Sequence, residues 1–523
     1  MGEFTHKFRS DRIFDMSRLA ELEKENEQLK DVTRRQAVRI DQLQLELMLA
    51  LYRMFSRSSE KFQPLGPLLF DEMEEQAAPA EPEVQSQAKK PARKGRRPLP
   101  ASLPRKHIYH DLPEAQRICR CGRCMTKFGE DLAEKLNIIP AQIWVECHHH
   151  AKYSCPDANC PCKGDGIEPG VVKAPGSLPL IPKSIVTAGL LAHIWTAKFC
   201  DHLPFYRQEA GFARLGADIS RQDMSRWTMR VSADLDPLVN LLIRAIREGP
   251  VIQMDETPVT VLKLDRSGTV GLGYMWLARG GTQEHPAVVY RFGPGRGSEH
   301  AQKILQDWEG FLQTDAYQGY DTLAKGTAIV LVGCWAHARR KFFEAHKTAP
   351  SPLTSDALGR IKKLYELEDK YRKQAREEHL TDEQFLEVRR SVLRPYLEDL
   401  RTWLDETAAQ TLPSGAAGKA LGYTVGQWDK LVRFLDHPWL TPDNNRAENA
   451  IRPFVVGRKN WLFHGNDAGA EASCRVYSLI ETAKMNGLEP WSYLNAALHR
   501  LPQVRLSGDW ESLLPWNLRP GIT

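Results

Sequence analysis

The spacing of apolar and polar residues changes several times along the chain, and each change predicts a different kind of element. Residues 16–55 repeat apolar positions with heptad spacing, and residues 184–248 alternate apolar and polar groups at helical spacing. From residue 250 onward, three runs rich in β-branched and aromatic residues are separated by turn residues, which predicts a meander of strands. Residues 352–436 return to a charged helical pattern. The chain is therefore expected to combine helical segments with a sheet.

The order of elements after residue 250 indicates the kind of sheet. The meander is followed by a helix, the strand GFLQTDAY, a short helix and the strand that begins TAIVLVGC. Three antiparallel strands followed by alternating helices and strands are typical of a mixed α/β sheet. The helical run 352–436 then interrupts the sheet domain before the stretch NNRAENAIRPF.

The heptad pattern at the N-terminus predicts a short zipper. One register places Asn26 and Thr33 at a positions and Gln36 at a d position, among leucines and isoleucines. A single Asn at an a position favours a parallel dimer in one register at a cost in stability. The alternative is a charged helix that packs on its own protein.

Composition and charge narrow the class of protein. The chain has 523 residues, 42% of them apolar and 26% charged, which is typical of soluble globular proteins. It has neither a run of 18 apolar residues nor an N-terminal signal core, so a cytosolic location is expected. The net charge of +5 is modest, but the stretch KKPARKGRRPLPASLPRK has eight basic and no acidic residues.

This basic stretch lies in a linker rich in Pro, Ala and charge. Its extended RKGRR segment could lie in the minor groove of DNA through Arg93, Lys94, Arg96 and Arg97. The alternative is a solvated basic linker.

Seven of the ten cysteines fall between Cys119 and Cys162, and in a cytosolic chain such clustering indicates a metal site. Two turns some thirty residues apart could present four thiolates to Zn²⁺. Our first choice of ligands is Cys121, Cys124, Cys155 and Cys160, with Cys119 and Cys162 as alternates. Cysteines without metal are the alternative interpretation.

The segment YRQEAGFARLGADISRQDMSRW has helix-turn-helix spacing. One helix is expected to end near Leu215, Gly216 makes the turn, and Ser220 caps a second helix. The exposed start of that second helix carries Arg221, Gln222 and Arg226, which could contact DNA. Ordinary helical hairpins share this spacing.

Two aspartates mark the predicted sheet. Asp255 interrupts an apolar strand, where a charge is costly to bury unless it is paired or binds a metal. Asp315 comes at the end of the fourth strand, and in a ribonuclease-H-like sheet the first and fourth strands are neighbours. Two divalent ions about 4 Å apart would relieve the repulsion between the carboxylates and orient phosphate oxygens. Glu256 points to the other face and is the weaker candidate.

A third oxygen ligand is expected from a later helix, and Glu448 is the best-placed acid. By itself, NNRAE also fits a capping box with Asn445 at the N-cap and Glu448 at the third position. In CWAHARRKF, Cys334 and His337 read as a buried thiol and a helix-starting histidine. A structural role beside the site, or contact with a DNA end, stays open for His337 and Arg340.

These motifs resemble the DDE transposases of the bacterial insertion-sequence-sixty-six family over most of the chain. The shared motifs include GRRPLPASLPR, ADISRQDMSRW, DETPV, TDAYQGY, GCWAHARRKFFE and NNRAENAIRPFVVGRKNWLF. The family pattern would place cysteines at Ile118 and Ala158, so the zinc ligand set differs here.

The resemblance implies a ribonuclease-H-like catalytic domain in which Asp255, Asp315 and Glu448 bind Mg²⁺ or Mn²⁺ and catalyse DNA cleavage and strand transfer. Expected partners are the terminal inverted repeats, target DNA and a second copy or more of this chain, in the bacterial cytoplasm at the nucleoid. Accessory proteins of the same element are left open. Other expected DNA contacts are Arg340, Arg452, Arg458, Lys459 and Trp461, although a core role for the tryptophan is an equal alternative.

We therefore expect a zipper, a linker, a cysteine-rich zinc-binding domain, a helical helix-turn-helix-like domain, a catalytic core in two parts around a helical insertion, and a tail. The zipper is expected at 16–55, the linker at 56–106, the zinc-binding domain at 107–170 and the helical domain at 176–249. The catalytic core is expected at 250–350 and 438–502, the insertion between them at 351–437, and the tail at 503–523. The competing hypotheses are a catalytically inactive DNA-binding regulator and a structure-specific nuclease on the same fold.

Overall fold

The computed structural model describes residue 26 and residues 142–154, 171–264 and 269–518. Apart from Asn26, which is helical, these residues belong to a compact unit that spans 98–523; a separate unit spans 1–97. The rest of the expected zipper, the basic residues 93–97 and the six zinc-ligand candidates lie outside the described residues.

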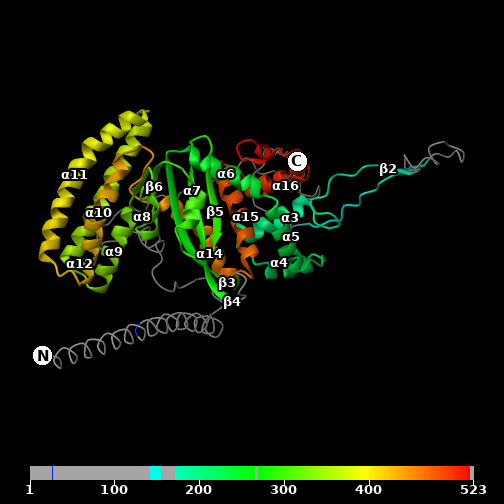
Figure 1. Cartoon of the computed structure of the whole chain (residues 1–523), viewed down its shortest axis with the longest axis horizontal. Coiled ribbons are helices and arrows are strands. Elements are labelled where there is room, and N and C mark those ends of the chain that lie inside the picture. Colours follow the sequence, from blue (N-terminus) through cyan, green and yellow to red (C-terminus); the bar gives the residue numbers. More distant parts are fainter. Residues whose placement is uncertain (1–25, 27–141, 155–170, 265–268, 519–523) are drawn as a thin grey trace, which may run out of the picture. The chain divides into compact units, whose positions relative to one another are not determined.

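A five-stranded mixed sheet forms the centre of the described unit (Figure 1). Its strand order is β5-β4-β3-β6-β7; β3, β4 and β5 pair antiparallel, whereas β6 and β7 run parallel to β3. The strands are β3 (Val251–Leu264), β4 (Thr269–Gly281), β5 (Pro286–Gly293), β6 (Gly310–Gln313) and β7 (Ile329–Val332). The prediction of a meander followed by alternating helices and strands is confirmed.

Helices cover both faces of β3. Helix α14 (Asn445–Trp461) packs on the face that carries Asp255, and its Arg458 donates to the hydroxyl of Thr257 at 3.0 Å. On the other face, Tyr320 of helix α8 (Gln318–Ala324) donates to Glu256 at 2.8 Å. Adjacent residues of a strand point to opposite faces, so the sheet separates Asp255 from Glu256 as predicted.

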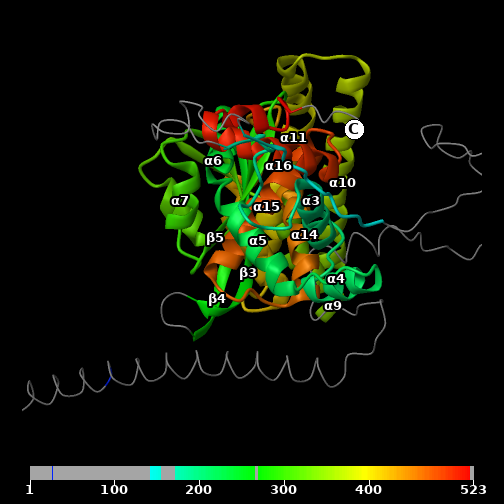
Figure 2. The same cartoon turned by 90° about the vertical axis from the view of Figure 1, so that its right-hand side faces the viewer.

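Helix α15 (Asp467–Met485) covers the free edge of β5 (Figures 1 and 2). The hydroxyl of Ser478 accepts from the backbone N–H of Tyr290 at 2.8 Å. The hydroxyl of Thr482 accepts from the N–H of Val288 and donates to its carbonyl. An open edge strand exposes unpaired backbone groups; here, side chains of α15 pair with them and close the sheet.

The turn between the two helices around Gly216 lies where it was predicted. Helix α4 ends at Arg214, Gly216 adopts a left-handed φ of 82°, and Ser220 caps α5 by accepting from the N–H of Asp223. Only glycine adopts that φ without strain. The four helices are α3 (Ala188–Phe199), α4 (Phe205–Arg214), α5 (Arg221–Ala233) and α6 (Asp236–Glu248), and they share one hydrophobic core with the sheet.

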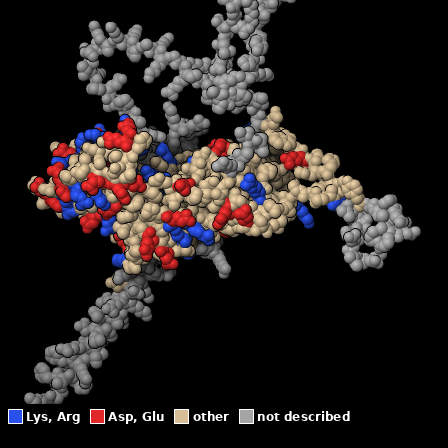
Figure 3. All heavy atoms as spheres, turned by 90° about the horizontal axis from the view of Figure 1, so that it is seen from above, with Lys and Arg blue, Asp and Glu red and all other residues tan. Residues whose placement is uncertain are grey.

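The run 352–436 is helical as predicted and has a second hydrophobic core. It contains α10 (Pro352–Glu377), α11 (Asp382–Gln410), α12 (Ala416–Gly426), α13 (Trp428–Val432) and a short 3-10 helix, and it packs on α9 (Trp335–Thr348). On the face shown in Figure 3, its acidic and basic side chains are interspersed. A mixture of both signs is typical of a solvated surface, so the insertion presents no uniformly basic patch on that face.

The described part also contains a pair of short strands, β1 (Lys152–Ser154) and β2 (Val171–Lys173). Remaining helices are α7 (Glu299–Leu305) beside the sheet and α16 (Pro490–Ser507), which packs on α3. Within the segment expected as a tail, Leu513, Leu514 and Leu518 are buried in the first core. None of the helices in the described residues is both long and apolar enough to cross a membrane.

Candidate metal centre

Asp255 lies on β3, and Asp315 follows the C-terminal end of the parallel neighbour β6 by two residues. The register pairs Gln253 of β3 with Gln313 of β6, and each aspartate follows two residues later. The two glutamines join the strands through a buried side-chain hydrogen bond of 2.8 Å. Because side chains two residues apart point to the same face, Asp255 and Asp315 continue the row that this glutamine pair begins.

Glu448 reaches the site from the first turn of α14 and is 3% exposed. The start of the helix is fixed by its neighbours: Asn444 donates from its side chain to the carbonyl of Met254 at 2.8 Å, and Asp443 accepts from the N–H of Asn445 at 3.1 Å. Since Met254 precedes Asp255, these contacts attach the helix to β3 beside the aspartate.

The capping-box interpretation of NNRAE is wrong. Asn444, not Asn445, occupies the N-cap, and its side chain makes no capping hydrogen bond because it bonds to β3. The carboxylate of Asp443 serves the first backbone N–H groups instead. Glu448 therefore does not reach back to the helix start and points toward α9.

Cys334 and His337 contact Glu448 from the junction of β7 and α9. The Cys334 Sγ lies 3.9 Å from Glu448 Oε1, and His337 Nδ1 lies 3.7 Å from the same oxygen. The ligand atoms of these three residues all lie within 4.8 Å of one another, and among the described residues they form the group with spacing suited to a metal ion. The sequence predicts a buried thiol and a helix-starting histidine, with a structural role beside the site left open for His337; the contact of both side chains with Glu448 was not predicted.

Two carboxyl groups of the site, Asp255 and Glu448, have raised pKa values. Burial raises the pKa of Asp255 well above its usual value, and the nearby Glu448, Glu256 and Asp315 raise it further. Burial likewise raises the pKa of Glu448 to about 7, against the opposing effect of the nearby Arg340. Burial lowers the pKa of His337 to about 4, so its imidazole is neutral at pH 7. A neutral imidazole and clustered carboxylates are groups that can bind a cation.

The donor atoms fit divalent metal ions. Glu448 Oε2 and His337 Nδ1 are buried without a hydrogen-bond partner in the described structure, which is costly unless another group pairs with them. Carboxylate oxygens suit Mg²⁺ or Mn²⁺, whereas the sulfur and nitrogen beside Glu448 suit softer ions. In the described residues the group with metal-like spacing is Glu448 with His337 and Cys334, and Asp255 and Asp315 do not belong to it. The carboxylates of Asp255 and Asp315 stay candidate ligands beside this group.

The other residues predicted to contact DNA lie in several places. Arg221, Gln222 and Arg226 are exposed at the start of α5, and Arg226 also pairs with Asp223. Arg452 and Lys459 are half-buried on α14, and Arg340 lies on α9 near Glu448.

Two of these residues have structural contacts. Arg458 donates to Thr257 and to the carbonyl of Pro258, which holds α14 on β3. Trp461 packs against the first core, with its ring 5.4 Å from that of Phe454 and 4.6 Å from that of His464. Of the two roles predicted for Trp461, packing against the core is the one that its position fits.

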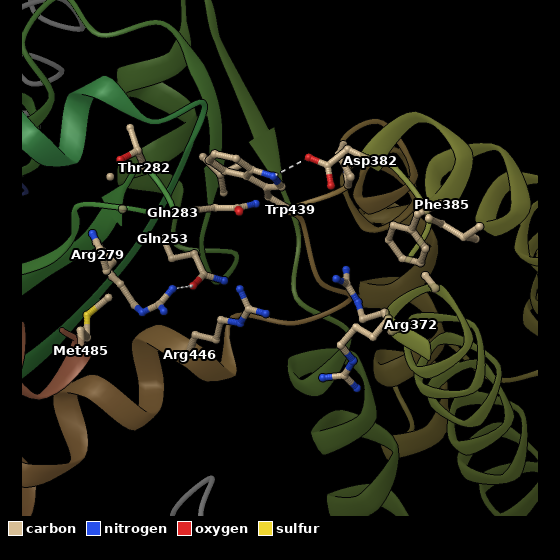
Figure 4. Close-up of a pocket in the computed structure, with 18 of the residues that line it drawn as sticks. Gln253, Arg279, Thr282, Gln283, Arg372, Asp382, Phe385, Trp439, Arg446 and Met485 are labelled. Carbon is tan, nitrogen blue, oxygen red and sulfur yellow. Dashed lines mark hydrogen bonds between the residues drawn. The ribbon is translucent and has the colours of Figure 1, made fainter. Parts of the chain in front are cut away.

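A pocket of about 780 Å³ adjoins the site and was not predicted from the sequence (Figure 4). It opens between β3 and β4 on one side and α10 and α11 on the other, and four arginines line it. These arginines are scattered from residue 279 to residue 446, so no local motif could have revealed them.

Four family models match the chain. The model of the transposase IS66 family matches residues 183–472, and the IS66 C-terminal element matches 478–516. The model described as transposase C of IS166 homeodomain matches 42–108, and the zinc-finger binding domain of transposase IS66 matches 116–157, which ends before Cys160 and Cys162.

Three relatives from Sinorhizobium fredii (strain NBRC 101917 / NGR234) are similar over most of their length. The uncharacterized protein y4qI is 32% identical over 84% of this chain and 81% of its own. The uncharacterized protein y4jD is 31% identical over 80% of this chain and 81% of its own length. The uncharacterized protein y4hP is 29% identical over 86% of this chain and 84% of its own length.

These matches define the class as transposases, with domains of the zinc-finger and leucine-zipper types before the main domain. The chain belongs to the transposase IS66 family, whose main model covers more than half of it, including Asp255, Asp315 and Glu448. Membership indicates a protein that acts on DNA, and it suggests a divalent metal in the main domain and zinc in the zinc-finger segment.

Proposed function

We propose that this protein is a DDE transposase that binds terminal inverted repeats and uses divalent metal ions to cleave DNA and transfer the strand to a target. The observation that supports this proposal is that Asp255 and Asp315 each follow the paired Gln253 and Gln313 by two residues, and that both Asp315 and Glu448 are near enough to raise the pKa of Asp255. The strand order, with three antiparallel strands followed by two parallel ones, supports a ribonuclease-H-like domain.

The proposed reaction is an in-line displacement at phosphorus. A water oxygen attacks the phosphodiester, the P–O3′ bond breaks, the water proton passes to solvent, and the leaving 3′ oxygen takes up a proton from solvent. In strand transfer, the resulting 3′-hydroxyl loses its proton to solvent and attacks a target phosphodiester, whose P–O3′ bond breaks and whose leaving oxygen is protonated in the same way. When bound, divalent ions lower the pKa of the attacking hydroxyl and neutralise charge on the phosphate oxygens. Asp255, Asp315 and Glu448 would hold these ions.

Residues around the carboxylates would orient the substrate. Arg340 lies near Glu448 and carries a positive charge toward the place where phosphate charge builds up. The exposed Arg221, Gln222 and Arg226 on α5 are the proposed contacts to inverted-repeat DNA. Arg452 and Lys459 are proposed backbone contacts, and the zipper and zinc segment are proposed to assemble two ends in a dimer or larger complex.

The test is incubation of the full chain with a labelled inverted-repeat end, a target plasmid and Mg²⁺ or Mn²⁺, beside Asp255→Asn. The inverted repeats are sought in the DNA that flanks the gene. Metal-dependent 3′-end cleavage and joining by the wild type alone would support the proposal. Binding without cleavage would favour an inactive regulator, and cleavage without joining a nuclease.

A further inference from the structure

The pocket beside the metal centre has an excess of positive charge. Its walls carry Arg279 from β4, Arg372 and Arg376 from α10, and Arg446 from α14, whereas Asp382 is its one acidic lining residue. Asp382 accepts a hydrogen bond from the indole of Trp439 at 2.9 Å and is therefore already engaged.

The protein supplies few carboxylates to these arginines. Arg372 shares the buried Glu368 with Arg389, so one acid serves two cations. Arg279 donates to the neutral amide oxygen of Gln253 at 3.3 Å rather than to an acid. Burial and the nearby positive charge of Arg372 lower the pKa of Arg446, whereas the nearby Asp443 raises it.

The positive charge of its lining makes the pocket better suited to anions than to cations. Burial lowers the pKa of Arg279 to about 10, and the nearby Arg446 lowers it further, yet the group stays charged at pH 7. Guanidinium groups held together without enough acids repel one another, and phosphate oxygens would relieve this repulsion through paired hydrogen bonds.

The pocket shares two elements with the candidate metal centre, although Asp255, Asp315 and Glu448 do not line it. Gln253 lines the pocket and Asp255 follows two residues later on the same face of β3, about 7 Å along the strand. Arg446 lines the pocket from the first turn of α14, the turn that also carries Glu448, although residues two apart on a helix point to different sides. Figure 4 shows Arg279, Gln253 and Arg446 side by side on the sheet side, with Arg372 on the α10 side.

We propose that this pocket holds the phosphodiester backbone of a DNA strand next to the reacting phosphate, between the sheet and the helical insertion. The inference rests on the proposed function and assigns to the insertion a direct role in holding DNA. Arginine contacts to phosphate need no particular base, so the pocket positions the strand without reading its sequence.

The test compares DNA binding by two double variants in an Asp255→Asn background, where no DNA is cut. Arg279→Gln with Arg376→Gln removes two charges that line the pocket. Lys362→Gln with Lys363→Gln removes two exposed charges of α10 that lie outside the pocket lining. The probe is a duplex that carries the inverted-repeat end, and the dissociation constant is measured over a range of salt concentrations.

The pocket variant is expected to raise the dissociation constant at least about tenfold, because two charge-assisted contacts are lost. The slope of log affinity against log salt should become shallower by about 1.8, corresponding to two phosphate contacts on duplex DNA. The lysine variant should keep the affinity and slope of the parent. Equal affinity and slope in both variants would overturn the inference.

A second measurement does not depend on removing arginines. A photoreactive benzoylphenylalanine replaces Gln283, which lines the pocket, or Lys362, which does not. Crosslinking to DNA from position 283 alone is expected, whereas crosslinking from neither position would contradict the inference. The two proposals can fail separately. If the wild type cleaves and joins DNA but the arginine double variant binds DNA as tightly as its parent, this inference is wrong and the proposed function stands. If the arginine double variant binds DNA more weakly but the wild type never cleaves it, the proposed function is wrong and this inference stands.

Discussion

Asn444 donates a hydrogen bond from its side-chain amide to the carbonyl of Met254, and this bond of 2.8 Å joins α14 to β3. Asn444 is 1% exposed, and the N–H of its backbone also donates to Cys334 Sγ at 3.3 Å. One residue thus connects the strand that carries Asp255 to the helix that carries Glu448. Its role is to position the metal centre rather than to take part in the reaction.

Asn444→Ala is expected to weaken divalent-metal binding by about 10- to 100-fold, the range found for residues that orient metal ligands. The loss of the buried bond should also lower the free energy of unfolding by about 1–3 kcal/mol. Titration calorimetry with Mn²⁺ measures the first effect and urea unfolding the second. Asn460→Ala, at an exposed position of the same helix, is the control. Unchanged Mn²⁺ affinity in Asn444→Ala would refute the positioning role.

Arg389→Met should destabilise the protein by about 3–5 kcal/mol, because it leaves the buried Glu368 short of a partner. Arg389 also donates to the carbonyls of His437 and Leu440, in the segment that leads to α14. Thermal and denaturant unfolding measure the loss. Exposed Arg394→Met on the same helix should change stability by less than about 0.5 kcal/mol; similar losses in the two variants would contradict the prediction.

The metal-free protein should gain stability as the pH falls from 8 to 5 through Glu448. The pKa of this carboxyl is about 7 in the folded protein, against an ordinary value of 4.5, so the folded state binds the proton more tightly than the unfolded state does. The contribution is fully present below pH 4.5 and is lost as the pH rises through 7, for a total of up to about 3 kcal/mol. Glu448→Gln should flatten this part of the pH profile, measured by thermal unfolding with a chelator that spares the zinc segment. A parallel profile in both proteins would show that Glu448 does not titrate in this range.

His337→Ala should weaken the binding of Co²⁺ more than that of Mg²⁺. An imidazole nitrogen 3.7 Å from Glu448 Oε1 can complete the coordination of a softer ion, whereas Mg²⁺ prefers oxygen. Calorimetry with the zinc-loaded protein measures both affinities. His499→Ala, on the exposed face of α16, controls for loss of an imidazole elsewhere. Equal losses for both ions would mean that His337 acts through packing alone.

The mixed sheet and most helix boundaries could be predicted because they depend on local patterns. Alternating apolar residues mark β3, and Gly216 with Ser220 marks the turn between α4 and α5. Asp255 could be singled out because a charge inside an apolar strand needs a partner. That β3, which carries Asp255, lies beside β6, which precedes Asp315, could be predicted from the expected order of strands.

Other features depend on contacts between segments that are distant in the sequence. The N-cap Asn444 bonds to Met254, 190 residues away, so the local capping pattern predicted the wrong hydrogen bonds. Cys334 and His337 come within reach of Glu448 only once α9 and α14 pack together. The pocket arginines converge for the same reason.

The most direct test of the metal centre is a metal-rescue measurement on Asp315→Cys. A thiolate binds Mg²⁺ poorly but accepts softer ions such as Mn²⁺ more readily. The account predicts that this variant cleaves an inverted-repeat end in Mn²⁺ but not in Mg²⁺, that Asp315→Ala is inactive in both, and that the wild type is active in both. Cleavage by Asp315→Cys or Asp315→Ala in Mg²⁺ at the wild-type rate would contradict it.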